Sequence, residues 1–213
     1  MNSGTGKALL ALDCSLKWTN VAVLSLSDGG LLAAERLNLG RRQSAELPLV
    51  VKGVLAKTKR GFSDLGLVAV TNGPGYFTGI RVGASYAMAL AYGLNLKLVP
   101  VSTLRMLAFP WFPKAVLAAV HAGRERLYAA SFGSLSRVLP LGEYSSGKLA
   151  DWLDAQESES FLLVSDDPQK TAESLPGRTI LPAAPDAAIV AQIAWNSRET
   201  ASVSPMELRI FYH

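Results

Sequence analysis

The sequence predicts an α/β protein built from two similar lobes. The chain has 213 residues, of which 49% are hydrophobic and 18% are charged, so it can bury a sizeable core. Short apolar runs of strand length alternate with longer segments of helical period. The first half shows the order strand, strand, strand, helix, strand, helix, strand. The second half loosely repeats this order.

The first lobe opens with three predicted strands. Apolar runs occupy 8–16, 20–27 and 31–39. The segment DGG at 28–30 separates the last two runs, and Asp-Gly between apolar runs is a strong hairpin signal. We therefore expect an antiparallel meander.

A helix is predicted next, because apolar residues recur with helical period over 44–59. Ser44 is a suitable N-cap, and Pro48 fits only within the first turn. The rest of this half reads as strand, helix and strand, at 65–72, 78–93 and 96–102.

The second half is more loosely patterned. A short helix is predicted at 103–109, followed by strands at 114–123, 126–133, 137–144, 160–167 and 178–183 and by helices at 145–155 and 185–199. We place the lobes at 1–102 and 103–213. Two βββαβαβ halves side by side are the architecture of the actin-like ATPase (ribonuclease H-like) fold, which actin, sugar kinases and heat-shock chaperones share.

Composition favours a soluble cytoplasmic protein. Cys14 is the only cysteine, which excludes an intrachain disulfide and suits a reducing compartment. The first residues lack the pattern of a signal peptide, and the apolar stretches are too short to span a bilayer, so we expect no membrane association. The net charge is +4, with basic spots at 40–42 and 57–60 that are either solvated helix ends or weak attractors of RNA or of an acidic partner.

The most unusual stretch is TNGPGYFTGIRVGASYAMALAYGLN, residues 71–95. Glycine-rich loops before helices often hold phosphate, but Ile80 stands where a P-loop has lysine. The third glycine of a dinucleotide fingerprint comes one residue late. The loop at 13–20, where actin-like ATPases cradle phosphate, has no glycine. Specific nucleotide-binding motifs are therefore missing.

Small residues instead form a stripe along the predicted helix. Gly79, Gly83, Ala87 and Ala91 recur every four residues and share one helix face. Glycine inside a helix costs about 1 kcal/mol relative to alanine, so close packing must compensate. The neighbour is either the chain's own sheet or a second protein, and the pattern alone leaves both open.

The same stretch resembles a known family. NGPGYFTGIRVG at 72–83 closely resembles the GxGPGSFTGxRxG signature of the TsaB (YeaZ) family. Shorter similarities follow in the right order over most of the chain, namely LLALDCS (9–15), RRQSAELPLV (41–50), VPVSTLRMLA (99–108), VHAGRERLYAASF (120–132) and SPMELR (204–209).

This resemblance implies an actin-like fold and a non-catalytic subunit. Members of the family pair with the TsaD-type transferase that makes threonylcarbamoyladenosine at position 37 of tRNA, a TsaE-type ATPase binds the pair, and tRNA is reached indirectly. We expect a homodimer when the partner is absent, no cofactor for the isolated chain, ATP or ADP only in the complex, and no metal. Family members pair chiefly through the two helices of the first lobe, which makes the interface candidates Leu47, Val50, Val51, Val54, Gly79, Arg81, Gly83 and Ala87.

Four positions depart from the family pattern: Gln43, His121, Gly123 and Glu207. Contacts that the family makes there do not carry over to this chain. No catalytic role depends on them.

Two enzyme classes are the alternatives. An actin-like ATPase or small-molecule kinase is disfavoured by the missing glycines in 13–20. An M22-type peptidase is disfavoured because only two histidines, His121 and His213, are present and neither HExxH nor GxSxG occurs. Asp13 is interpreted as a vestige or loop cap, and Cys14 as a small buried hydrophobe.

Overall fold

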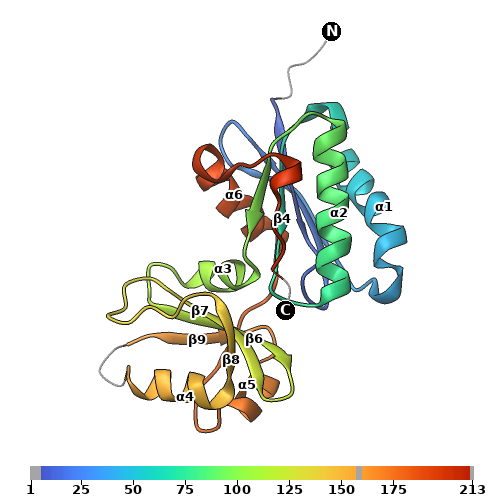
Figure 1. Ribbon diagram of the computed structural model, residues 1–213. Coiled ribbons are helices and arrows are strands. Elements are labelled where there is room, and N and C mark those ends of the chain that lie inside the picture. Colours follow the sequence, from blue (N-terminus) through green and yellow to red (C-terminus); the bar gives the residue numbers. More distant parts are fainter. Residues whose placement is uncertain (1–5, 157–159, 212–213) are drawn as a thin grey trace. The chain divides into compact units, whose positions relative to one another are not determined.

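The computed structural model describes residues 6–156 and 160–211. The chain divides into two compact units (Figure 1). The first contains the described residues up to Thr103 together with those from Pro185 onward, and the second contains Leu104–Ala184. Each unit is built on its own five-stranded sheet.

The sheet of the first unit has the strand order β3-β2-β1-β4-β5. Strands β1, β2 and β3 form the expected antiparallel meander, and β4 and β5 extend the sheet in parallel with β1. The strands are β1 (Ala8–Asp13), β2 (Thr19–Ser25), β3 (Leu31–Leu37), β4 (Leu65–Thr71) and β5 (Leu98–Val101).

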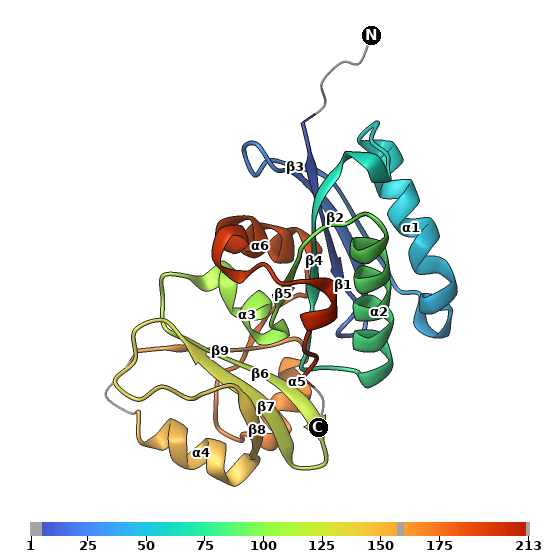
Figure 2. The same ribbon diagram turned by 45° about the horizontal axis from the view of Figure 1, so that its top comes forward.

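Helices cover both faces of this sheet (Figures 1 and 2). Helices α1 (Gln43–Lys57) and α2 (Phe77–Gly93) lie side by side on one face, and α6 (Ala187–Ala201) packs on the other. Between α1, α2 and the sheet lies one apolar core, whose fully buried side chains include Leu10, Leu12, Val21, Leu47, Val51, Val68 and Ala87. No helix in the described part of the chain is both long and apolar enough to cross a bilayer.

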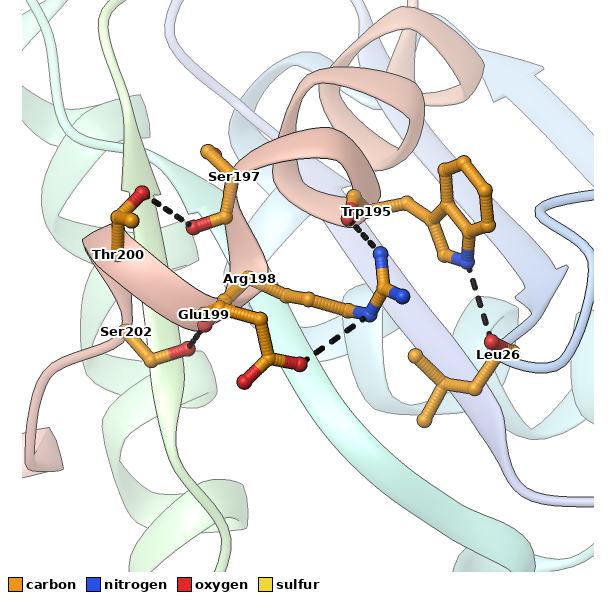
Figure 3. A network of polar contacts seen from close by, with 7 residues as sticks. All are labelled: Leu26, Trp195, Ser197, Arg198, Glu199, Thr200 and Ser202. Carbon is orange, nitrogen blue, oxygen red and sulfur yellow. Dashed lines mark hydrogen bonds and ion pairs between the residues drawn. The ribbon is translucent and has the colours of Figure 1, made fainter.

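Trp195 anchors α6 to the first unit (Figure 3). Its indole Nε1 donates a 3.1 Å hydrogen bond to the carbonyl of Leu26, just after β2. The guanidinium of Arg198 lies 4.6 Å from the centre of the ring and also donates to the Trp195 carbonyl. On the hairpin after β2, Gly29 adopts a φ of +71°, and a Cβ there would lie 2.9 Å from the indole. The hairpin and the helix therefore fit only because Gly29 has no side chain.

This packing changes the domain division expected from the sequence. The sequence predicts a C-terminal lobe over all of 103–213, whereas the structure groups the residues from Pro185 onward with the first unit. The reason is non-local, because α6 buries its apolar face on β1, β2 and β5. The segment after it also joins the first sheet, through an antiparallel bridge between Val203 and Leu98.

The second unit has the sheet order β10-β9-β6-β7-β8. Strands β6, β7 and β8 form an antiparallel meander, and β9 and β10 follow in parallel with β6. The elements are β6 (Val116–Gly123), β7 (Arg126–Phe132), β8 (Gly142–Ser145), α4 (Ser146–Asp154), β9 (Leu162–Ser165), α5 (Pro168–Ser174) and β10 (Leu181–Pro182).

The two sheets share one topology. Reading the second as β8-β7-β6-β9-β10 reproduces β3-β2-β1-β4-β5, with a helix before each parallel strand. A further helix follows each last strand, α3 (Thr103–Ala108) after β5 and α6 after β10. The predicted pair of βββαβαβ lobes is therefore confirmed at the level of topology.

Two local expectations are wrong, and one helix was missed. Ser44 does not cap α1, because a 3-10 turn at Gly40–Arg42 runs directly into the helix, which begins at Gln43. The strand expected at 137–144 pairs only from Gly142 onward. Helix α5 was not predicted, because its seven residues carry no apolar period and bury only Thr171.

Candidate functional site

Asp13 ends β1 at the sheet edge where ligands of open α/β folds usually bind. Its carboxylate is fully buried and accepts hydrogen bonds from three neighbouring side chains. The donors are Ser15 Oγ at 2.6 Å, Asn20 Nδ2 at 2.8 Å and Thr71 Oγ1 at 2.8 Å, and the Ser15 backbone N–H adds a fourth at 3.1 Å. The carboxylate therefore ties β1 to β2 and β4, which agrees with its interpretation as a loop cap.

Cys14 is equally enclosed. The residue is 1% exposed and packs in the core under α2. Burial raises the pKa of the Cys14 thiol, and the charge of Asp13 raises that pKa further. Because the thiolate is the reactive form, this environment keeps the side chain inert. The expected role of a small buried hydrophobe is confirmed.

The glycine loop is filled by the chain's own backbone. The Tyr76 N–H donates a 2.7 Å hydrogen bond to the carbonyl of Ser15. A Cβ on Gly75 would lie 2.2 Å from that same oxygen, and a Cβ on Gly79 would lie 2.0 Å from the carbonyl oxygen of Cys14. The glycines therefore admit the loop between β1 and β2 against the start of α2.

The C-terminal segment closes the end of β4. Phe211 N–H donates to the carbonyl of Asn72 at 2.9 Å, and Asn72 Nδ2 donates to the carbonyl of Arg209 at 3.0 Å. Gly73 adopts a φ of +100°, and a Cβ there would lie 2.7 Å from the carbonyl oxygen of Phe211. Residues more than 130 positions apart in sequence thus share this edge.

The structure corrects the predicted interface set. Six of the eight candidates, namely Leu47, Val51, Val54, Gly79, Gly83 and Ala87, are buried inside the first unit. At Gly83, a Cβ would lie 3.1 Å from the Cβ of Cys14. The stripe of small residues therefore packs on the chain's own sheet and offers no surface to a partner. Val50 is partly buried, and Arg81 is exposed beside the ring of Phe77 at 5.1 Å.

The outer faces of the same helices carry the surface that sequence reasoning missed. Leu49 on α1 is 68% exposed, and Tyr92 on α2 is 72% exposed. Arg81 is the only charged residue among the 17 of α2. We call the exposed residues of α1 and α2 the α1–α2 face. Counting charges along α2 would have found this half of the face from the sequence.

The four departures from the family pattern have local structural roles. Gln43 Nε2 donates to Thr19 Oγ1 at 2.8 Å and so fixes the start of α1 to the start of β2. His121 Nδ1 accepts from the N–H of Gly123, whose φ of +96° forms the turn between β6 and β7. Glu207 accepts from the N–H of Ser204 in a capping box.

Metal-ligating side chains do not gather in the described residues, where no group of three His, Cys, Asp or Glu side chains is placed to hold an ion. The geometry defines a protein of the actin-like α/β class, in which the chain's own backbone, side chains and C-terminal segment make the contacts at the ends of β1 and β4.

Comparison with known proteins agrees with this class. Residues 38–166 match the family model of TsaD, tRNA N6-adenosine threonylcarbamoyltransferase. The chain is 31% identical over 134 residues to the tRNA threonylcarbamoyladenosine biosynthesis protein TsaB of Buchnera aphidicola, which covers 59% of this chain and 61% of that protein. It is 34% identical over 126 residues to the TsaB of Haemophilus influenzae, covering 56% of this chain and 51% of that protein. The matched region thus spans about half to two thirds of these relatives.

A solved structure extends the likeness to the whole chain. YeaZ from Pseudomonas aeruginosa superposes with a TM-score of 0.80 at 24% identity, over 97% of this chain and all of the other. The chain belongs to the TsaB (YeaZ) family, and it matches the TsaD family model over more than half of its length.

Gly79→Ala tests the close contact between α2 and the loop after β1. We expect a loss of about 3 kcal/mol or more in the free energy of unfolding, because the new Cβ meets a backbone oxygen that cannot rotate away. Gly93→Ala in the same helix is the matched control, since a Cβ there has no neighbour within 4 Å. Urea unfolding of both variants checks this, and equal stability would show that the contact is not required.

The Cys14 thiol provides a second test. We expect no reaction of the native chain with Ellman's reagent at pH 8, because the thiol is buried and its pKa is raised. The same chain in denaturant should release one equivalent of thionitrobenzoate within minutes. Rapid labelling of the native chain would contradict the enclosed geometry.

Proposed function

We propose that this chain is a non-catalytic subunit in the biosynthesis of threonylcarbamoyladenosine in tRNA. It would act in the cytoplasm as a scaffold and activator of a TsaD-type transferase, with a TsaE-type ATPase joining the pair. Family membership supports the pathway, since the relatives' names place them in this biosynthesis.

One observation carries the non-catalytic role. The edge of the first sheet that could hold a ligand is occupied by the chain itself, through the carboxylate of Asp13 with its four donors and through Gly79 against the Cys14 carbonyl. Neither group is available to a substrate without unfolding this edge. The buried thiol of Cys14 offers no nucleophile there.

The α1–α2 face is the surface that we assign to the transferase subunit. Protein interfaces are depleted of charge at their centres and enriched in tyrosine, methionine and arginine. The exposed surface of α2 has this character, with Tyr92 at one end, Arg81 near the other and uncharged Ser85 and Ala89 between them. When the transferase is absent, a second copy of this chain would cover the same face as a homodimer.

Nucleotide binding separates this proposal from a kinase or ATPase. We expect the isolated chain to gain less than about 1 °C in melting temperature with ATP and magnesium, since its own residues fill the edge. A true binder at 100 times its Kd would gain about 2.7 kcal/mol, a shift of roughly 5–10 °C for a domain of this size. Repeating the melt with the transferase subunit present tests whether ATP or ADP binds only in the complex. A large shift for the isolated chain would contradict the scaffold role.

Ala89→Arg tests the assigned surface. We expect the variant to capture the transferase subunit of the same organism at least tenfold less well than the wild type, because an unpaired charge would be buried at the interface. Asn196→Arg is the matched control, because it places the same exposed charge on α6, on the other face of the sheet. Quantitative co-purification, with circular dichroism to confirm folding, gives the measurement.

Equal capture by both variants would remove the α1–α2 face from the interface. Loss of capture by both would indicate a general effect of added charge. Sedimentation of the wild type and Ala89→Arg without the transferase shows whether the homodimer uses the same face.

A further inference from the structure

Trp18 lies at an exposed corner of the first unit, in the loop between β1 and β2. The guanidinium of Arg36, on β3, sits 4.6 Å from the centre of its ring, and Lys17 Nζ lies 6.0 Å from it. Both cations are exposed, while the indole is half-buried. The ring and the two cations thus form a cation–π cluster that carries positive charge at this corner.

Two more arginines are brought to the same corner. Thr19 pairs with Leu37 at the end of β3, and Thr19 Oγ1 accepts the 2.8 Å hydrogen bond from Gln43. The turn that joins β3 to α1 therefore carries Arg41 and Arg42 past the beginning of β2, and both are exposed. We call Lys17, Trp18, Arg36, Arg41 and Arg42 the basic corner.

Little acidic charge balances the basic corner. Arg42 is paired with Glu46 at 2.5 Å. None of the ion pairs between described residues involves Lys17, Arg36 or Arg41. Four cations of the corner therefore have one carboxylate partner among the described residues, and Lys17, Arg36 and Arg41 are in no ion pair there.

The geometry points to an RNA-binding surface at the basic corner. Cations spread over an exposed surface suit the repeated phosphates of a nucleic acid, whereas each alone holds a single small anion weakly against hydration and salt. Unstacked bases lie on aromatic rings and on arginine guanidinium planes, and the corner supplies both groups in Trp18 and the Arg36 held over it. The identification of the RNA as tRNA rests on the proposed function. The family resemblance implies contact with tRNA only through partner subunits, and the basic corner would add a direct contact.

Neutralising the corner tests this inference with the full chain. We expect Lys17→Gln, Arg36→Gln and Arg41→Gln together to weaken binding of an unmodified tRNA transcript about tenfold or more at 100 mM salt. The slope of log affinity against log salt should fall by about two to three, because three phosphate contacts are lost. Trp18→Leu, made separately, should lose roughly five- to hundredfold in affinity while retaining the salt slope. Fluorescence anisotropy between 50 and 200 mM salt measures both.

The matched control removes three exposed lysines outside both basic spots, Lys97→Gln, Lys114→Gln and Lys170→Gln. It changes net charge equally and should leave tRNA affinity within about twofold. Equal loss in the control, or no loss in the corner variant, overturns the inference by showing that general charge or another surface binds the RNA. A wild type that fails to bind the transcript also overturns it.

Capture of the transferase subunit by the same variants separates this inference from the proposed function. Corner variants that lose tRNA but still capture the transferase support both. A third outcome is that the wild type captures no transferase while the corner variant still loses tRNA binding. This outcome supports the RNA surface and overturns the proposed function. Corner variants that bind tRNA normally but lose the transferase identify the corner as a protein-binding site and overturn the inference.

Discussion

The contact between the backbone of α2 and the loop after β1 fixes the rest of the first unit. At Gly79 the helix approaches the carbonyl of Cys14 so closely that no side chain fits, and at Gly83 it rests on the Cys14 side chain. Further along the same face, alanine is small enough for close packing at Ala87 and Ala91, because these residues lie against the sheet beyond that loop. Each glycine costs about 1 kcal/mol of helix stability, which close packing offsets by dispersion and by excluding water from the strand ends.

This approach determines what the edge of the sheet can do. Pressing α2 onto the loop buries Asp13, and a buried carboxylate is tolerable only with good hydrogen-bond donors around it. Ser15, Asn20 and Thr71 supply them from a loop and two strands. In an open site the carboxylate of Asp13 and its donors could bind a ligand. Here their hydrogen bonds connect three strands. The proposed function accordingly rests on the outer surfaces of the unit.

Much of the fold was predictable because it rests on local signals. Buried strands, the Asp-Gly hairpin and the α1 and α2 helices follow from apolar runs, turn residues and period. Helix α5 has no such period, and the packing of α6 depends on Trp195 meeting a hairpin some 170 positions away, which no local pattern encodes. The candidate site was harder still. The four-residue spacing of small side chains shows that Gly83 shares a helix face with Ala87. This spacing does not show whether that face meets a strand or another protein. The structure places the face on the strand.

The basic corner and the α1–α2 face lie next to each other in the first unit. Gln43 begins α1, touches Thr19 beside the corner and lies 3.3 Å from where a Cβ on Gly79 of α2 would be. A partner on the two helices would therefore stand close to RNA held at the corner. A few phosphate contacts from this chain would bind RNA weakly on their own. If the chain is attached to a partner that also binds RNA, these contacts would act at high effective concentration and raise the affinity of the complex for RNA. The corner would thus bind RNA modestly through this chain alone and more tightly in a complex with such a partner.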